Sequence, residues 1–376
     1  MYKNFLITGL LMLMFSFSLQ AQSSKSPTDL PNISVLGNIM TSDKAKNKTP
    51  LLKNLEVAFQ HYLYPTVKAD VILAVHKEKA TDETSLEIEE AYVTFTDFFA
   101  ELLPDFLPET GLGLEVGKKL LSVGKDNARH CEQLDFTEKS IASQHFFGEH
   151  GLAAEGVKVQ QLLPLPFFSQ LELGSYVAAT HAHGSHDEDD HEEDEHEEDE
   201  HGEDEHGEES TASLFKDRLI SARLWNGFNI GSHQEIEIGF SHLIAQNEQK
   251  KDKNKPRIAA LDLSYALDFA GQNSLKLKGE LFQGYYGHDG EERARQNAGF
   301  ISTTYTFNPF YNVGVRYAYI DKHGDEGSYQ SQWSYMATKQ LTETSKFRLQ
   351  FNDGKNHEEF LIQFLFGFGP HSHVLQ

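Results

Sequence analysis

The 376-residue chain carries 33 basic and 57 acidic side chains, a formal net charge of −24, and a single cysteine, Cys131. This balance excludes nucleic acid as a partner, because phosphate binding requires a basic surface that displaces counterions. One cysteine excludes an internal disulfide framework and any metal site built from several cysteines, so we expect Cys131 to be inert. The length is compatible with several soluble domains or with one large barrel.

Residues 1–21 have the pattern of a secretory signal peptide. Lys3 precedes an apolar run from Leu10 to Phe17, and the segment ends in a small residue, Ala21, after which we expect cleavage. No later segment approaches the roughly 20 apolar residues that a membrane-spanning helix needs. The exported protein is therefore expected to be periplasmic, secreted or a membrane β-barrel.

From Ile33 onward, apolar and polar residues alternate with a period of two, which predicts strands. Leu275 and Leu277, for example, alternate with Lys276 and Lys278, so one face of this strand is apolar and the other charged. The pattern predicts sixteen strands, at 33–40, 54–64, 67–77, 86–96, 111–120, 151–162, 169–179, 214–225, 232–244, 257–269, 274–286, 296–306, 311–320, 328–339, 346–352 and 357–368.

The connections between these segments alternate between two kinds. Most odd-numbered segments are followed by a long polar loop, the longest being 121–150 and 180–213, whereas most even-numbered segments are followed by a tight turn such as Pro65-Thr66. The connection 97–110 is the main exception. Sorting of long loops to one side is typical of outer-membrane barrels with both termini in the periplasm, and a Greek-key sandwich would not produce it.

We therefore predict an all-β fold, a transmembrane antiparallel up-and-down β-barrel of about 16 strands, within a range of 14 to 18. The barrel spans 33–368, follows a short periplasmic lead at 22–32 and precedes a periplasmic tail at 369–376. A barrel of this size leaves an aqueous lumen. Its last strand has an aromatic and aliphatic face, which is typical of a signal for barrel assembly: Phe360, Ile362, Phe364, Phe366 and Phe368.

Several stretches of the sequence resemble a known family. They are Leu86–Thr94, Phe146–Val157, Leu162–Phe168 and Gly369–His373. These stretches are similar to porin-like outer-membrane barrels of Gram-negative bacteria that are labelled as zinc-regulated outer-membrane receptors. The resemblance implies an outer-membrane barrel and assigns no chemistry to individual residues. The ten or so residues before the first strand leave no room for the plug of an energised transporter, so we expect passive transport.

Most of the negative charge is concentrated in one segment. Residues 181–209 contain 17 Asp or Glu, 7 His and no Lys or Arg, so this stretch carries −17 of the net −24. Imidazole and carboxylate together suit Zn²⁺ and related divalent metals. The five-residue spacing of five of the histidines aligns them on neither a helix nor a strand, which favours a weak multivalent collector over one rigid site. The candidate ligands are His181, His183, His186, His191, His196, His201 and His206.

A solvated spacer without a specific ligand is the alternative for this segment, which the strand count places on the fourth external loop. A His-x-His pair, His371 and His373, lies near the end of the chain. It suggests at most a weak contact with metal in the periplasm, and an incidental tail explains it better.

The other long loop, 121–150, is the third external loop. In general porins such a loop folds into the lumen and narrows it. The alternative is that the loop caps the barrel. If it enters the lumen, the charged and imidazole side chains that would line the constriction are Lys125, Arg129, His130, His145 and Glu149.

Alternation also predicts which charges on the strands face the lumen. Five are acidic and four are basic, so the predicted lumen is nearly balanced and any cation preference would come mainly from the external loop. These residues are Glu235, Glu237, Asp262, Asp268, Lys276, Lys278, Glu280, Arg316 and Arg348.

Enzymatic interpretations find little support. The glycine-rich stretch Gly111–Gly117 does not match a dinucleotide-binding motif, and hydrolase, zinc-protease and Walker motifs do not occur in the sequence. We expect no enzymatic activity and no required cofactor.

The sequence best fits a passive porin-like channel in the outer membrane of a Gram-negative bacterium, associated with the collection or uptake of divalent metal, with zinc as the first candidate. Its expected partners are outer-membrane lipid, divalent metal ions and small solutes; the oligomeric state stays open. A non-conducting metal-binding or adhesion barrel is the first alternative, and a soluble exported metal buffer is the second.

The histidine-rich segment generates a direct prediction. A peptide covering residues 178–212 should bind Zn²⁺ at pH 7.5 and release it as the pH falls toward 6. The neighbouring carboxylates raise the pKa of the histidines, so protons compete with the metal in this range. Calorimetric titration at both pH values measures this, and a peptide that binds no Zn²⁺ at pH 7.5 rejects the metal-collecting hypothesis.

Overall fold

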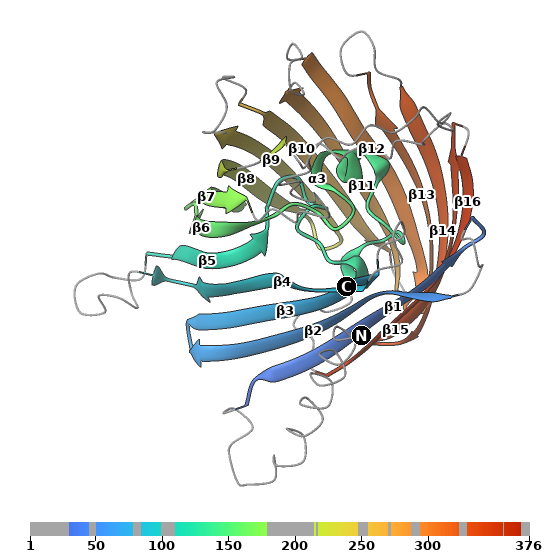
Figure 1. Ribbon diagram of the computed structural model, residues 1–376, viewed down its shortest axis with the longest axis horizontal. Coiled ribbons are helices and arrows are strands. Elements are labelled where there is room, and N and C mark those ends of the chain that lie inside the picture. The colour runs from blue at the N-terminus through green and yellow to red at the C-terminus, as the bar shows by residue number, and fades with distance from the viewer. Residues whose placement is uncertain are drawn as a thin grey trace, which may run out of the picture.

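The computed structural model describes residues 30–44, 50–77, 84–98, 110–178, 214–215, 217–246, 255–269, 272–286, 294–322, 329–355 and 357–369. Within them the chain forms one closed barrel of sixteen strands, in which sequence neighbours pair antiparallel and β1 pairs with β16 (Figure 1). The predicted fold and strand number are confirmed. The strands are β1 (Asn32–Ser42), β2 (Leu51–Tyr64), β3 (Val67–Lys77), β4 (Thr84–Phe95), β5 (Leu112–Leu120), β6 (Ala153–Leu162), β7 (Phe168–Ala178), β8 (Arg218–Ile230), β9 (Gln234–Gln246), β10 (Arg257–Phe269), β11 (Asn273–Tyr286), β12 (Ala294–Asn308), β13 (Tyr311–Ile320), β14 (Gln330–Thr342), β15 (Ser345–Gly354) and β16 (His357–Phe368).

Several predictions fall outside the described residues. They are the signal peptide 1–21, the lead up to residue 29, the whole histidine-rich loop 180–213 with its seven histidines, and the tail from residue 370. They stay predictions.

The strand with the largest boundary error is β8, which was predicted at 214–225 and lies at Arg218–Ile230. The strand continues past the predicted end, since Gly227 pairs with Phe168 of β7 and with Glu237 of β9. The turn comes later, at Gly231, whose φ of 69° is readily adopted by glycine.

The two faces of the barrel wall differ in polarity, as the alternation predicts. On β10, Leu261 and Leu263 point outward and are 46% and 50% exposed, whereas Asp262 between them points inward and is 1% exposed. Exposed aromatic residues gather where strands meet the short turns, like the girdle at a membrane interface. They are Tyr62, Tyr64, Phe168, Phe269, Phe307, Phe310, Tyr311 and Phe368.

The last strand, β16, has the predicted division between its faces. Gln363 is fully buried on the lumen side, whereas Phe360 and Phe368 are exposed on the outer side. Phe364 and Phe366 stack on that outer face with ring centroids 5.9 Å apart.

The connection between β5 and β6, residues 121–152, is called the inner loop below. It carries a 3₁₀ helix, η2 (Cys131–Gln133), and a short α-helix, α3 (Ile141–Phe147), and Figure 1 shows both inside the ring of strands. The Ser140 hydroxyl caps α3 by accepting a hydrogen bond from the Ser143 amide at 3.1 Å. Among the residues with assigned structure, no helix is long and apolar enough to cross a membrane.

Candidate functional site

One side of the inner loop is held by apolar packing. Phe146 and Phe147 of α3 are at most 1% exposed and lie 5.7 and 5.5 Å from the ring of Phe282 on β11. Burying two such side chains contributes roughly 3–6 kcal/mol. The surrounding cluster includes wall residues from β8 to β12: Leu219, Leu243, Ile258, Phe282 and Ala298.

The opposite side of the inner loop is held by cationic side chains from the wall. Arg348 of β15 donates hydrogen bonds to the carbonyls of Phe136 and Leu134, at 2.6 and 2.9 Å. Arg316 of β13 donates to the carbonyl of Glu138 at 2.9 Å. These carbonyls lie away from water and need donors, so the arginines fix the path of the loop. Two predicted lumen charges, Arg316 and Arg348, are thus loop anchors.

Acidic lumen residues anchor the start of the loop. Glu280 of β11 accepts hydrogen bonds from the amides of Lys125 and Asp126, at 2.9 and 2.7 Å. Asp262 of β10 pairs with Arg223 of β8 at 2.8 Å, and this arginine also donates to the carbonyl of Gly124. The sequence analysis did not single out Arg223, although it lies at an inward position of a predicted strand.

The predicted constriction residues all belong to the inner loop: Lys125, Arg129, His130, His145 and Glu149. The ammonium of Lys125 pairs with Glu237 of β9 and donates to Ser264 of β10 at 2.9 Å. Arg129 pairs with Asp126 of the same loop at 3.1 Å.

The later part of the loop contacts other strands. Nε2 of His145 lies 2.7 Å from the side-chain oxygen of Gln296 on β12. Glu149 pairs with Lys53 of β2 at 2.5 Å, and Lys53 also pairs with Glu138 at 2.8 Å. The loop therefore enters the lumen, one of the two positions that the sequence left open, and contacts well-separated parts of the wall; its role as a constriction stays a proposal.

The lumen is filled unevenly along the barrel axis. On the inward face of β10, Ile258 and Asp262 are at most 1% exposed, whereas Asp268, next to a short turn, is exposed. At the same position along the barrel axis, Glu235 of β9 is also exposed and Lys276 of β11 is partly exposed. The inner loop thus occupies the half near the long loops. We call the other half, lined by Glu235, Asp268 and Lys276, the vestibule.

Lys278 lies between these two halves. It faces the lumen as predicted and pairs with Asp135 of the inner loop. Burial by itself raises the pKa of Asp135, but Lys278 outweighs that effect and lowers the pKa to about 2. The lumen charges above the vestibule therefore mostly hold the loop.

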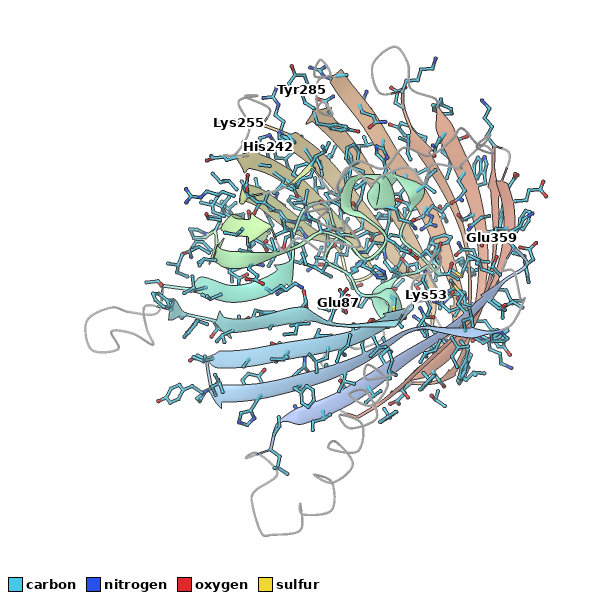
Figure 2. The ribbon with its side chains drawn as sticks, viewed as in Figure 1. Lys53, Glu87, His242, Lys255, Tyr285 and Glu359 are labelled. Atoms are coloured by element: carbon cyan, nitrogen blue, oxygen red, sulfur yellow. The ribbon has the colours of Figure 1, made fainter. Side chains whose placement is uncertain are left out.

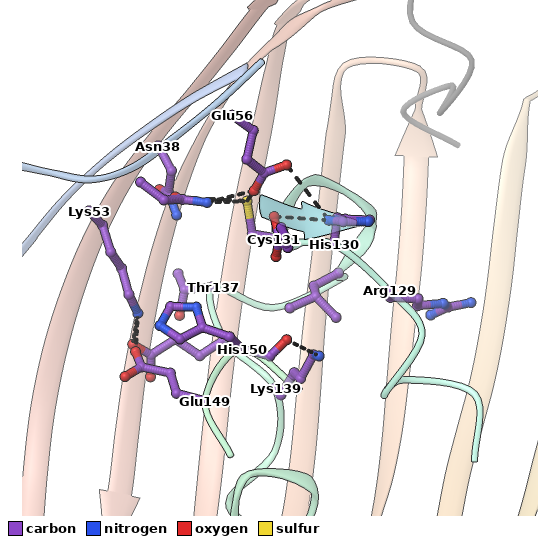
Figure 3. A pocket seen from close by; sticks show the side chains of 14 residues that line it. Asn38, Lys53, Glu56, Arg129, His130, Cys131, Thr137, Lys139, Glu149 and His150 are labelled. Carbon is purple, nitrogen blue, oxygen red and sulfur yellow. Dashed lines mark hydrogen bonds and ion pairs between the residues drawn. The ribbon is translucent and has the colours of Figure 1, made fainter. Parts of the chain in front are cut away.

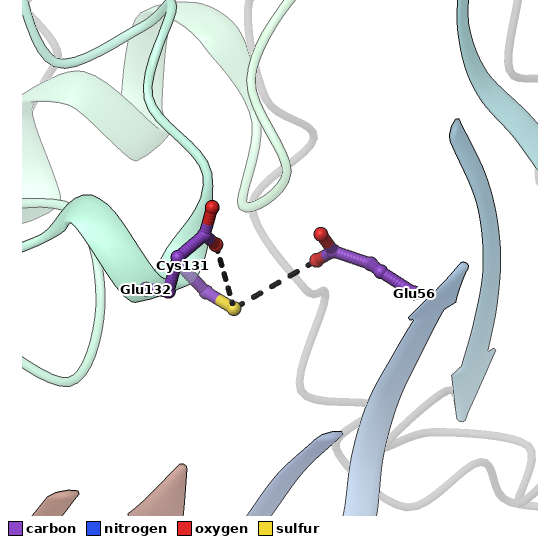
Figure 4. A group of neighbouring side chains, drawn as sticks. All are labelled: Glu56, Cys131 and Glu132. Atoms are coloured by element: carbon purple, nitrogen blue, oxygen red, sulfur yellow. Dashed lines mark hydrogen bonds between the residues drawn. The ribbon is translucent and has the colours of Figure 1, made fainter. Parts of the chain in front are cut away.

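A group of buried titratable residues surrounds His130, and we call it the His130 cluster. Nε2 of His130 lies 3.2 Å from Oε2 of Glu90, and Nδ1 lies 3.7 Å from carboxylate oxygens of both Glu56 and Glu89. The cluster continues with Cys131, whose Sγ lies 3.7 Å from Glu56 and 3.8 Å from Glu132 (Figure 4). Wall strands β2 and β4 and the inner loop all contribute to it.

Burial and charge act in opposite directions on His130. Burial lowers its pKa, but Glu89, Glu90 and Glu56 outweigh this effect and hold the pKa well above its ordinary value. For Cys131, burial and the carboxylates of Glu56 and Glu132 all raise the pKa, so the thiol stays protonated. A protonated thiol is a weak nucleophile, and the expectation that Cys131 is inert stays a prediction.

Two β-bulges place additional charged residues inside the barrel beside the loop. On β2, Asn54 pairs with Asn38 and Leu52 with Ile39, so Lys53 is the extra residue. On β4, Glu90 pairs with Ile72 and Ile88 with Leu73, so Glu89 is extra. A bulge lets two adjacent residues share one face.

The sequence analysis missed these residues, although the adjacent acids Glu89 and Glu90 interrupt the alternation and signal the bulge. Figure 2 shows Lys53 of β2 and Glu87 of β4 on the lumen side of the wall.

A cavity opens between the inner loop and strands β1, β2 and β4 (Figure 3). It encloses about 480 Å³ of empty space, part of it continuous with solvent. Its lining combines both signs of charge, with Lys53, Lys139, Glu56, Glu89 and His130 among the residues that face it.

The chain resembles known proteins in its fold and not in its sequence. No protein-family model and no curated protein matches the chain. The fold resembles the outer membrane channel DcaP of Acinetobacter baumannii, with a TM-score of 0.54 and 11% identity over 92% of this chain and 99% of that one. The chain has a porin fold.

Two further porin-fold structures are similar. An anion-selective porin from Comamonas acidovorans matches with a TM-score of 0.53 and 11% identity, over 90% of this chain and 100% of that chain. OprB of Pseudomonas putida matches with a TM-score of 0.55 and 9% identity, over 90% of this chain and 94% of that chain. Sequence identities this low support a shared fold and nothing further. The resemblance to zinc-regulated receptors stays a prediction.

Replacing Arg348 tests how firmly the inner loop is held. Arg348→Met leaves two buried carbonyls without their donors, which should cost roughly 2–5 kcal/mol and loosen the loop. Trypsin should then cleave after Lys125, Arg129 or Lys139 at least tenfold faster in detergent-solubilised protein, as followed by mass spectrometry. Arg295→Met, at an exposed position on β12, is the matched control. Equal cleavage rates in both variants would show that Arg348 does not anchor the loop.

Proposed function

We propose that the protein is a passive outer-membrane channel for small hydrophilic solutes and that its histidine-rich external loop collects divalent metal, zinc first, at the channel mouth. The main support is the combination of a closed sixteen-strand barrel, a polar inner face and a long loop folded inward. Barrels of this size have room for an aqueous lumen, and an inner loop narrows such a lumen without a separate plug.

The outer face supports the membrane location. Its exposed residues are apolar along the strands and aromatic at the short-turn end, a pattern that would be adhesive in water and is stable in lipid. This observation argues against the alternative of a soluble exported metal buffer.

The wall from β4 to β7 supports a path for solutes. There Lys158 lies 2.7 Å from Glu115 and 3.6 Å from Glu172, and Lys119 lies 3.0 Å from Glu115. These charges pair with one another along the wall, whereas Glu237, Glu280 and Arg348 of other strands contact the inner loop. A path lined by paired charges of both signs would favour polar solutes and discriminate weakly between ions.

The metal-collecting part of the proposal depends on the sequence of loop 180–213, which connects β7 to β8. Seven histidines among 17 carboxylates offer many weak sites and a high local concentration of cations. β7 ends and β8 begins at the same end of the barrel as the other long connections, so collected metal would be held at one mouth of the lumen.

A non-conducting metal-binding or adhesion barrel is the second candidate. It is favoured by the reach of the inner loop, which contacts β2 through Lys53, β11 through Glu280 and β15 through Arg348. Contacts on such widely separated strands are what a closed lumen would require.

Conductance in planar bilayers tests the proposal and separates the two candidates. We expect discrete single-channel steps from the full chain and from a variant lacking residues 180–210, because this variant keeps all sixteen strands of the barrel. We also expect the deletion to remove most of the weak Zn²⁺ binding measured by calorimetry. Absence of conductance in both proteins would reject the channel, and unchanged zinc binding would reject the collecting role of the loop.

The channel should become more cation-selective at alkaline pH. Burial lowers the pKa of Lys125 and Lys139 in the inner loop to about 8 each, so both are charged at neutral pH and lose their charge above pH 8. Raising the pH from 7 to 9 therefore makes the lumen more negative. The reversal potential in a KCl gradient should shift toward that of K⁺, and Lys125→Gln should reduce the shift. A reversal potential independent of pH would contradict this.

A further inference from the structure

We propose that Glu56, Glu89 and His130 form an ordered site inside the barrel for one divalent cation of the zinc class. The site goes beyond the proposed channel and does not depend on the histidine-rich loop. It lies where the bulged strand β4, the neighbouring face of β2 and the inner loop converge.

The separation of the donor atoms fits a bound cation. One ligand atom from each of Glu56, Glu89 and His130 lies within 4.8 Å of the other two. Nδ1 of His130 is 3.7 Å from an oxygen of each carboxylate, which is longer than a hydrogen bond. Ligands about 2.1 Å from a tetrahedral zinc ion are roughly 3.4 Å apart, so a small closure of the site would bring all three into its coordination shell.

Glu90 supplies the support that a metal-binding histidine requires. Its Oε2 lies 3.2 Å from Nε2 of His130, on the side of the ring away from Glu56 and Glu89. When a cation replaces the proton on Nδ1, the proton that Nε2 donates to this carboxylate keeps the lone pair of Nδ1 directed toward the other two. Histidines that bind metals usually have such a carboxylate partner, which fixes the tautomer and the ring orientation. Glu90 is itself held by the amide of Leu120, which donates to Oε1 at 2.9 Å.

The charge of the cluster also calls for a cation. A protonated His130 supplies one positive charge to three carboxylates, those of Glu56, Glu89 and Glu90, and burying the excess negative charge is costly unless more positive charge is supplied. The lysines that line the same cavity are engaged elsewhere: Lys53 pairs with Glu138 and Glu149, and Lys139 donates to two backbone carbonyls. Within the described residues, Oε2 of Glu89 is buried and accepts no hydrogen bond.

The donor set indicates the class of cation. One imidazole and two carboxylates suit Zn²⁺ and neighbouring transition metals, whereas Ca²⁺ and Mg²⁺ prefer oxygen ligands alone. The thiol of Cys131 and the carboxylate of Glu132 share Glu56 with this site and form a second triad of potential ligands (Figure 4). The adjoining cavity provides a route from the lumen (Figure 3).

The test uses the barrel lacking residues 180–210, stripped with a chelator and titrated with Zn²⁺ alone in detergent. We expect one zinc ion to bind per barrel. His130→Gln and Glu89→Gln should each weaken its binding by about 100-fold, and Glu90→Gln by about 10-fold to 100-fold. His242→Gln, which replaces a histidine of β9 near the rim of the barrel (Figure 2), is the matched control and should bind zinc normally.

Visible absorption with Co²⁺ provides a second readout, because a four-coordinate site gives intense bands that a solvated ion lacks. Heat-modifiable migration on gels establishes that each variant is folded. A folded loop-deleted barrel that binds no zinc, or binds it equally well after His130→Gln, would overturn the proposal. Conductance recorded from the same preparations tests the channel proposal separately, since ion flow through the barrel does not require the zinc site.

Discussion

The pairing of the first strand with the last is the constraint on which the rest of the structure depends. Eight residue pairs join β1 to β16, from Val35–Phe368 to Ser42–Leu361, and they leave the sheet without an edge. Each strand residue must then point either outward or into an enclosed space. The enclosed polar groups need partners there, and the inner loop provides many of them.

The barrel was predictable because its signals are local and repeated. Alternation such as that of Leu275 to Glu280 assigns residues to faces, and the sorting of loops by length gives the connectivity. Bulges interrupt this regularity: counting by twos from Glu87 places Glu89 inward but Glu90 outward, whereas both face the lumen. β8 likewise extends beyond its predicted end, because Asn226 and Gly227, although residues common in turns, pair with both neighbouring strands.

The site was predictable only in part. The comparison with general porins offered the lumen as one of two positions for loop 121–150, and alternation predicted that Glu280, Arg316 and Arg348 point inward. The sequence did not show which of these residues contact one another. Cys131 and Glu56, for example, are 75 residues apart and come together only because the wall is curved. His130 was predicted as a lumen residue because it belongs to the long loop. Its carboxylate partners lie on β2 and β4, and the sequence of neither strand indicates that a histidine of the loop contacts it.

The anchors of the inner loop have a consequence for the order of assembly. The loop lies between β5 and β6, yet Gln350 of β15 accepts from the amide of Thr137 at 2.9 Å, and Gln363 of β16 donates to the carbonyl of the same residue. These partners are synthesised last and take their positions when the sheet closes. The loop can complete these contacts only once β15 and β16 have joined the sheet, and it braces the seam between the two ends of the barrel from within.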